Sequence, residues 1–292
     1  MMKLGAAWYG FREQTASNYF EMAAALNLNY VEIPFYWQII EDKLFDYRSL
    51  KGIAEILSTA ERAGVRVVSS VSCFELAGRF NMHGNEISPS AVDFGRAGAR
   101  RVIDLGAEMG VEILRITEPN VSPDRLDEAR PYMEEYGRAM RVLGDYAAER
   151  EVRLVVENYG LTSEQVNWLL DAADHSAVGT LYDPCNYYRI GEDPLSALKN
   201  LGERVSYCHL KDAVRGDPRD PKILHVHSRW PPSVAVGEGE IDWGPILAEL
   251  DTFYDGYVCI EYEVAEDVMC GTRASIEHIR RIADDRSIAL EP

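Results

Sequence analysis

Four ionisable residues stand at the C-terminal ends of four successive apolar runs in the second half of the chain. They are Glu157, Asp183, His209 and Glu261, and we call them the strand-end quartet. Three carboxylates on neighbouring strands repel one another unless a positive charge lies between them. One divalent cation would remove that repulsion, and a neutral imidazole would complete its ligand set. Three oxygen ligands and one nitrogen favour Mn²⁺, with Mg²⁺, Co²⁺ or Zn²⁺ as alternatives.

A different interpretation of the quartet requires no metal. The same carboxylates would form ion pairs with nearby bases, for which Arg115, Lys211 and Arg215 are candidates. Single polar residues at strand ends are common in α/β barrels, but four in successive runs favour a shared ligand. We therefore expect Arg115, inside the run Leu114-Arg115-Ile116, to support the ligands by pairing with Glu157 or a neighbouring carboxylate.

Eight short apolar runs must position the quartet, and they alternate with amphipathic stretches along the whole chain. The runs are Leu4–Trp8, Tyr30–Phe35, Val65–Val71, Glu112–Thr117, Arg153–Asn158, Gly179–Asp183, Val205–Leu210 and Tyr257–Tyr262. Most are too short for helices and several are rich in Val and Ile, as buried parallel strands are. Eight strand-then-helix units in 292 residues predict an α/β fold, a single (β/α)8 TIM barrel domain over 1–292. An open doubly wound sheet is the alternative.

Helical spacing of apolar residues fills the segments between the runs. The predicted helices are Ser17–Asn27, Leu50–Ala63, Ala91–Met109, Pro131–Glu149, Glu164–Ala173, Pro194–Leu201, Trp243–Leu250 and Thr272–Ala283. Gly64 and Gly110 are predicted C-terminal caps, and Asp242 is a predicted N-terminal cap. The longest irregular stretch, about 213–241, follows the seventh run. We expect this loop to lie over the mouth of the barrel, as active-site loops do.

Composition excludes several classes of partner. The net charge of −18 and the pI of about 4.8 repel phosphate backbones and anionic lipid, so we expect neither nucleic acid nor a membrane as partner. The five cysteines are widely spaced without a C-x-x-C motif, which is typical of reduced thiols. Neither a signal-peptide core nor an apolar run of membrane-spanning length is found. We therefore expect a cytoplasmic protein.

Four strings around the quartet resemble the xylose-isomerase-like barrel superfamily, and within it the sugar isomerases and epimerases. They are Val156-Glu157-Asn158, Asp183-Pro184-Cys185-Asn186, His209-Leu210-Lys211-Asp212 and Ile260-Glu261, and the segment Val236–Trp243 is similar to a recurrent segment there. The resemblance implies that the quartet binds a single metal ion. It also implies that Glu157 and Glu261 move a proton on opposite faces of the substrate, and that Arg215 helps to bind it. Barrels of this branch are commonly oligomeric, so a homo-oligomer is compatible with the resemblance.

The sequence departs from two branches of this superfamily. Ketose 3-epimerases have a histidine three residues after the metal-binding aspartate, where this chain has Asn186. Relatives of the endonuclease IV type hold three zinc ions with additional histidines, for which this chain offers Ser72, Thr117 and Asn186. Together with the acidic net charge, these replacements argue against a DNA nuclease.

The quartet predicts proton transfer next to a carbonyl group. A cation that chelates a carbonyl oxygen and the neighbouring hydroxyl acidifies the C–H bond between them, because it stabilises the enediolate that forms. Glu157 would remove the proton and Glu261 would return one, or the reverse. Return of the proton to the opposite face is an epimerisation, and its return to the adjacent carbon is an isomerisation. We favour these two reactions. Loss of a β-hydroxyl would instead give a dehydratase, as in the inosose dehydratases of the superfamily. A non-catalytic barrel, or a subunit that requires a partner, is the hypothesis of another class.

Other side chains are candidates for binding a small carbohydrate or cyclitol. Lys211 would neutralise substrate charge, or else form a solvated pair with Asp212. Aromatic rings after the first two runs would stack on a sugar, and His227 would bind substrate or form a second metal site with His225. The candidates are Arg215, Asn186, Lys211, His227, Trp8 and Trp37. No phosphate-loop motif is found, so we expect an unphosphorylated substrate.

Overall fold

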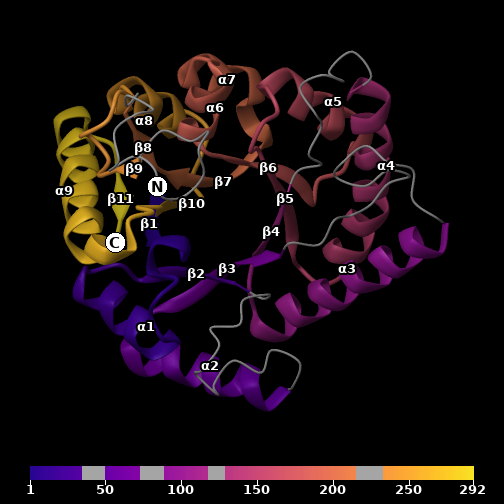
Figure 1. Ribbon diagram of the computed structural model, residues 1–292, viewed down its shortest axis with the longest axis horizontal. Coiled ribbons are helices and arrows are strands. Elements are labelled where there is room, and N and C mark those ends of the chain that lie inside the picture. Colours follow the sequence, from indigo (N-terminus) through magenta and orange to yellow (C-terminus); the bar gives the residue numbers. More distant parts are fainter. Residues whose placement is uncertain (35–49, 73–88, 118–128, 215–232) are drawn as a thin grey trace.

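Eight parallel strands close into a barrel with helices around it (Figure 1). The computed structural model describes residues 1–34, 50–72, 89–117, 129–214 and 233–292. In barrel order the strands are β1 (Met2–Ala6), β2 (Tyr30–Pro34), β3 (Arg66–Ser72), β4 (Ile113–Thr117), β5 (Arg153–Glu157), β6 (Val178–Tyr182), β7 (Val205–Leu210) and β10 (Tyr257–Ile260). Strand β1 pairs in parallel with both β2 and β10, which closes the sheet. The predicted single-domain TIM barrel is confirmed, and the open sheet is excluded.

Helices follow the strands in the expected alternation. They are α1 (Ala16–Ala25), α2 (Leu50–Ala63), α3 (Pro89–Met109), α4 (Ala129–Ala148), α5 (Ser163–Ala173), α6 (Pro184–Ile190), α7 (Pro194–Leu201), α8 (Trp243–Asp251) and α9 (Val268–Arg286). All except α6 overlap a predicted helix. Gly64 and Gly110 have φ of +77° and +68°, the left-handed conformation of a C-terminal cap. The Asp242 side chain accepts a hydrogen bond from Gly244 N and so caps α8, as predicted.

Several short elements were not predicted from the sequence. Within the described residues, short 3₁₀ helices lie at η1 (Tyr9–Phe11), η3 (Gly202–Arg204) and η4 (Ala265–Asp267). Strands β8 (Asp212–Ala213) and β9 (Ser233–Val234) pair antiparallel inside the stretch predicted to be an irregular loop, of which 215–232 lie outside the described residues. Strand β11 (Leu290–Glu291) pairs with the start of β1. Two-residue strands carry no periodic signal, because they depend on a partner distant in sequence.

An apolar cluster fills the barrel interior below the polar strand ends. Its members are Ala7, Tyr30, Val68, Ile113, Val155, Leu181, Tyr207, Tyr257 and Cys259. Side chains alternate between the two faces of a strand, so residues two positions apart share a face. Four members of the cluster precede the quartet by two positions: Val155, Leu181, Tyr207 and Cys259. The quartet therefore lies on the interior face, one layer above this cluster.

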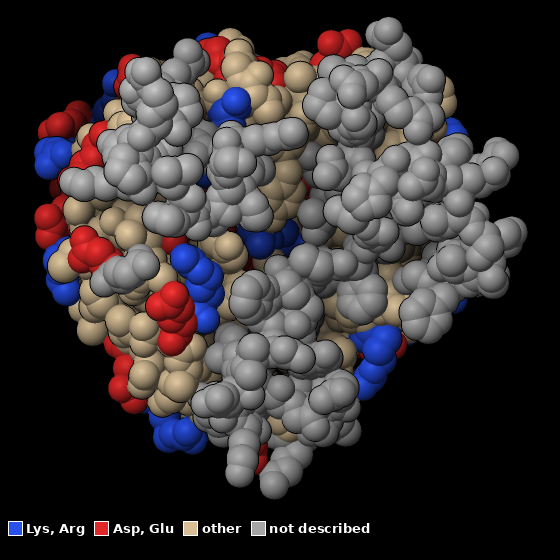
Figure 2. All heavy atoms as spheres, viewed as in Figure 1, with Lys and Arg blue, Asp and Glu red and all other residues tan. Residues whose placement is uncertain are grey.

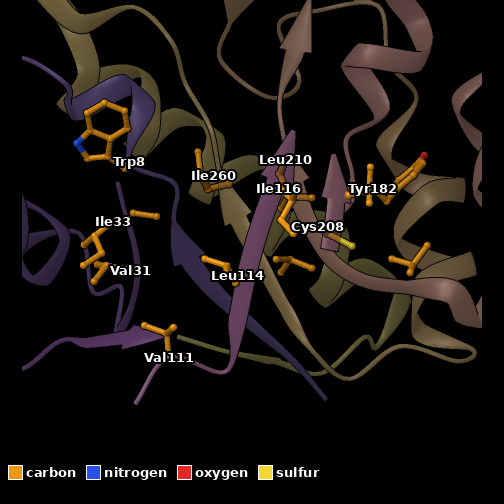
Figure 3. Close-up of a cluster of buried hydrophobic side chains, with 14 of the residues drawn as sticks. Trp8, Val31, Ile33, Val111, Leu114, Ile116, Tyr182, Cys208, Leu210 and Ile260 are labelled. Carbon is orange, nitrogen blue, oxygen red and sulfur yellow. The ribbon is translucent and has the colours of Figure 1, made fainter. Parts of the chain in front are cut away.

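A larger apolar cluster fills the space between the strands and the helices. Figure 3 shows part of it, including Leu114 and Ile116 of β4 and Leu210 of β7. These residues alternate with the inward-facing ones, so each strand is buried on both faces. Burial on both faces explains why the strands read as nearly continuous apolar runs.

Two observations bear on the environment that we expected for the protein. In the part of the chain that the structure describes, none of the helices is both long and apolar enough to span a membrane. Cys185, Cys208, Cys259 and Cys270 are free thiols, and Cys73 lies outside the described residues. The cytoplasmic location stays a prediction.

Candidate metal centre

The strand-end quartet lies at the C-terminal ends of four strands that are neighbours in the barrel. Strands β5, β6, β7 and β10 pair in this order (Figure 1). All four side chains are buried, and one ligand atom from each lies within 4.8 Å of the others. Ligand atoms about 2.0–2.6 Å from one ion are at most about 5 Å apart. The cluster is therefore able to hold one metal ion.

Asp183 is fixed by the helix that it begins. It is the N-cap of α6, and its Oδ1 accepts hydrogen bonds from the backbone N–H of Cys185 at 2.9 Å and of Asn186 at 3.2 Å. Pro184 occupies the first helical position, where a missing N–H costs nothing. The Asp-Pro pair was a sequence signal for this helix that we did not use. Capping leaves the other oxygen, Oδ2, directed to the site.

Lys211 is buried among three carboxylates. Its Nζ lies 2.7 Å from Glu261 Oε2, 2.8 Å from Asp183 Oδ2 and 3.3 Å from Glu263 Oε1. Burial lowers the pKa of Lys211, but Asp183 and Glu261 outweigh it and raise the pKa well above its ordinary value. The lysine is therefore a cation in the metal-free site. The alternative of a solvated pair with Asp212 is wrong, because both side chains are buried.

Arg115 contacts the other side of the quartet. Its Nη1 lies 3.1 Å from Glu157 Oε2 and 3.7 Å from Glu261 Oε1. The ion pair with Glu157 is the partnership that the sequence predicted for this arginine. Both ion-pair candidates that the structure describes, Arg115 and Lys211, thus contact the quartet, while Arg215 lies outside the described residues. Ion pairing and a ligand cluster coexist here, although the sequence presented them as alternatives.

Glu32 is a site residue that the sequence interpretation missed. It is fully buried in β2, and its Oε2 lies 3.3 Å from His209 Nε2 and 3.9 Å from Arg115 Nε. Burial raises the pKa of Glu32, but Arg115 and His209 outweigh it and lower the pKa below its ordinary value. A charged residue within the apolar run Tyr30–Pro34 is the same signal that identified Arg115. A charged residue inside a predicted buried strand is therefore the sequence signal that identifies Glu32.

A second polar group adjoins Lys211. Arg189 Nη1 donates a hydrogen bond to Asn186 Oδ1 at 3.0 Å, and its Nη2 lies 3.3 Å from Glu263 Oε2. Asn186 is completely buried, and its Nδ2 has no hydrogen-bond partner among the described residues. A buried donor without a partner is uncommon in native structures.

The charges of the site fit a divalent cation. Among the described residues, Glu32 and Glu263 join the three carboxylates of the quartet, and these five face three bases, Arg115, Arg189 and Lys211. With a neutral His209, the excess is two negative charges. Two carboxylate oxygens of the quartet, Glu157 Oε2 and Asp183 Oδ2, are also buried. Among the described residues, neither accepts a hydrogen bond of regular geometry, although Arg115 and Lys211 are close. Both the charge and the available lone pairs suit one divalent ion.

The pKa values of the two glutamates of the quartet are shifted in opposite directions. Burial raises the pKa of Glu157, although Arg115 opposes the shift. For Glu261 burial is outweighed by Lys211 and His209, which hold its pKa well below the ordinary value. Paired carboxylates with divergent pKa values are typical of proton-transfer sites.

His209 has a raised proton affinity in the same environment. Burial lowers the pKa of His209, but Glu261 and Glu32 outweigh it and raise the pKa to about 10. A metal ligand must be neutral, so a cation at this site competes with that proton.

Asp212 fastens the segment that leads into α8. Its carboxylate accepts hydrogen bonds from Gly237 N and Trp243 Nε1 at 2.9 Å each, and from Ile241 N at 3.3 Å. A Cβ on Gly239 would lie 1.9 Å from Asp212 Oδ1, so this glycine permits the close approach. The role of Asp212 is therefore structural, next to Lys211 in sequence but separate in function.

The predicted substrate-binding aromatics are only partly described. Trp8 follows β1 and is buried at 1% exposure, within the cluster between strands and helices (Figure 3). Trp37, Arg215 and His227, together with His225 of the suggested second metal site, lie outside the described residues. Figure 2 shows atoms of basic side chains near the middle of the face in view. Of the six predicted substrate contacts, the structure brings Lys211 and Asn186 beside the quartet.

A family model described as a xylose isomerase-like TIM barrel matches residues 20–282 of the chain. In sequence, the chain is 33% identical over 130 residues to an inosose dehydratase of Clostridium perfringens. This match covers 41% of the chain, and the chain spans only 44% of the length of that relative.

Solved structures share the fold over nearly the whole chain. A D-tagatose 3-epimerase-like protein has a TM-score of 0.73 at 16% identity, and the match covers 98% of this chain and 100% of that one. An IOLI protein with a binding zinc atom has a TM-score of 0.72 at 16% identity, with 96% and 99% covered. At these identities the likeness shows a common fold.

Proposed function

Because the chain belongs to the family of xylose isomerase-like TIM barrels, we propose that it is an enzyme that removes a proton from a carbon next to a carbonyl group. The observation that carries the proposal is the buried quartet, in which two glutamates lie beside an aspartate and a histidine at the barrel mouth. The inosose dehydratase relative and the epimerase-like neighbour support a keto-cyclitol or keto-sugar as substrate.

The residues that would hold one divalent cation are Glu157, Asp183, His209 and Glu261. When bound, such a cation supplies Lewis acidity, which stabilises negative charge that develops on a carbonyl oxygen. The ligand types favour Mn²⁺, and the zinc atom in the IOLI structure supports Zn²⁺ as the other candidate.

Glu157 is the residue to which we assign removal of the proton. Its pKa is raised by burial, which makes its carboxylate a stronger base than Glu261. On the other side, Lys211 Nζ lies 2.7 Å from Glu261 Oε2. We assign the second proton transfer to this pair, in which Glu261 is ionised in the resting site and Lys211 holds the proton.

The destination of that proton separates two reactions. In a dehydration the C–H proton goes to Glu157, a C=C bond forms, the β-carbon–oxygen bond breaks, and the Glu261–Lys211 pair protonates the departing hydroxyl to give water. In an epimerisation the same pair returns a proton to the opposite face of the α-carbon. The sequence predicts epimerisation or isomerisation, with dehydration as the alternative. We favour dehydration, because the inosose dehydratase is 33% identical over 130 residues of the chain, whereas the likeness to the epimerase-like structure at 16% identity shows the fold alone.

An uncharged substrate fits the charge of the site. Five carboxylates, three bases and one divalent cation cancel among the described residues. A phosphorylated substrate would bring a charge of about −2 with no excess of described bases to receive it. We therefore propose a neutral keto-cyclitol or keto-sugar.

Deuterium incorporation tests the shared first step. The purified protein is incubated in D₂O with Mn²⁺ or Zn²⁺ and a panel of inososes, ketoses and 3-keto-glycosides, and NMR follows the proton next to the carbonyl. We expect exchange that requires metal, together with the ultraviolet absorbance of an enone when a β-hydroxyl is lost. Exchange with a sugar epimer and no enone would establish the second candidate.

Two variants assign the exchange to the site. Glu157→Gln should reduce exchange by at least about a hundredfold, because general base catalysis contributes about 10²–10⁴. Glu203→Gln, a change to an exposed glutamate in η3, should leave it unchanged. Absence of exchange with every metal and every substrate would contradict the proposed function, as would full activity of Glu157→Gln.

A further inference from the structure

The two ring nitrogens of His209 face different partners. Nδ1 is directed to the quartet, 3.3 Å from Glu261 Oε2 and 3.7 Å from Glu157 Oε1. Nε2 is directed away from it and lies 3.3 Å from Glu32 Oε2. A half-turn of the ring would exchange both nitrogens for carbon atoms, so both polar contacts would be lost. The ring orientation is therefore determined by Glu32 on one side and the quartet on the other.

Glu32 is buried in the position from which it accepts this contact. Its side chain is fully buried, and Arg115 Nε lies 3.9 Å from the same Oε2 that faces His209. Its backbone is contacted as well, because the single hydroxyl proton of Tyr19 is shared between Ala6 O at 2.8 Å and Glu32 O at 3.0 Å. The tyrosine of α1 thereby contacts both β1 and β2.

A carboxylate at the second nitrogen selects one tautomer of an imidazole. Ligating histidines commonly donate their other N–H to a carboxylate, which fixes the ring and increases its strength as a ligand. Here the carboxylate comes from β2, on the side of the barrel away from the four ligand-bearing strands.

We propose that Glu32 is a positioning residue that keeps the proton of neutral His209 on Nε2, so that Nδ1 is the atom that binds the metal ion. This inference rests on the proposed metal centre. It assigns a function to a residue outside the quartet and predicts the ligand atom. The metal site thus extends over a fifth strand, β2.

Cadmium-113 NMR of the full-length protein tests the ligand atom directly. The protein is labelled with ¹⁵N-histidine, loaded with ¹¹³Cd²⁺, and His209 is assigned by the loss of its signals in His209→Gln. We expect ¹¹³Cd–¹⁵N coupling to Nδ1 and a directly bonded proton on Nε2. Coupling to Nε2 would overturn the inference while leaving the metal centre intact. Absence of any cadmium binding would instead contradict the proposed function.

A matched pair of variants tests the role of Glu32 itself. Glu32→Gln keeps the shape and removes the charge, and should weaken Cd²⁺ and Zn²⁺ binding about ten- to a hundredfold. Glu112→Gln is the control, because Glu112 also pairs with an arginine, Arg66, but at the opposite end of β4. It should change the affinity less than twofold. Wild-type affinity in Glu32→Gln would overturn the positioning role, and the cadmium coupling in the wild type remains a valid test if that variant does not fold.

Discussion

Lys211 shows at the scale of one residue how the site tolerates its own negative charge. A buried lysine is unfavourable unless carboxylates surround it, and this one lies within 3.3 Å of three. It lies between Asp183 and Glu261 and carries its charge in the metal-free site. The quartet therefore depends on a cation that the chain itself supplies, in addition to any metal.

Replacing Lys211 should destabilise the metal-free protein strongly. In Lys211→Met, Asp183 and Glu261 lose their shared partner, and breaking a buried ion pair costs about 3–5 kcal/mol. The free energy of unfolding, measured by urea denaturation with a chelator present, gives the loss. Lys199→Met is the control, because Lys199 is 57% exposed and its contact with Glu249 is 4.0 Å. Equal, small losses in both variants would contradict a structural role for Lys211.

Metal affinity should depend steeply on pH through His209. The pKa of His209 is raised to about 10, so the ring is protonated at neutral pH and must lose a proton to bind metal. Below pH 10 the apparent affinity should therefore rise about tenfold per pH unit. Competition with a chelator of known affinity between pH 6.5 and 8.5 measures the slope. His209→Gln should bind more weakly and with a flatter slope, and a pH-independent wild type would contradict the assignment.

Helix α6 shows at the scale of an element how one residue serves two purposes. Asp183 ends the connection from β6 and begins the helix, and one of its oxygens is used for each purpose. Capping restrains the ligand oxygen, because the carboxylate cannot rotate without losing two backbone hydrogen bonds. The seven-residue helix thereby contributes to the order of the site.

Two substitutions of Asp183 should separate capping from metal binding. Asparagine caps helices as well as aspartate does, so Asp183→Asn should keep α6 while metal affinity falls at least about a hundredfold. Asp183→Ala should lose the same affinity and about 1 kcal/mol more stability than Asp183→Asn, the typical value of an N-cap. Metal content and urea denaturation of both variants measure the two effects. If the two variants are equally stable, the cap contributes nothing.

At the scale of the whole molecule, the site joins strands from distant parts of the chain. Glu32 and His209 are 177 residues apart, and closure of the barrel through β1 and β10 brings their strands to one mouth. The apolar layer below, from Val155 to Cys259, keeps the polar residues at the strand ends. A metal ion bound here would link β5, β6, β7 and β10 and so stabilise half of the barrel.

Binding of a divalent ion should therefore stabilise the entire fold. A ligand that binds only the folded state at a hundred times its dissociation constant adds about 2.7 kcal/mol. Urea denaturation with Mn²⁺ or Zn²⁺, against the same protein with a chelator, should show this difference. Glu157→Gln should reduce it, and the exposed control Glu203→Gln should retain it in full. Equal stability with and without metal would contradict a structural metal centre.

The sequence by itself determined the barrel and the composition of the quartet. The spacing of apolar residues in strands and helices is a local property. The eight apolar runs, and the helix caps at Gly64, Gly110 and Asp242, could therefore be recognised without a structure. The pairing of Arg115 with Glu157 also followed, because a charge within a buried strand requires a partner. Arg215, His227 and Trp37 stay predictions.

Only the tertiary structure decided which groups surround the quartet. Glu32 and Lys211 acquire their roles from contacts across the barrel mouth, and Asp212 acquires its role from the segment 237–243. Such contacts leave no periodic trace, because each depends on where the barrel brings two distant strand ends together. The quartet can therefore be recognised in the sequence as four strand ends. The contacts that Arg115, Lys211 and Glu32 make with it depend on the closure of the sheet.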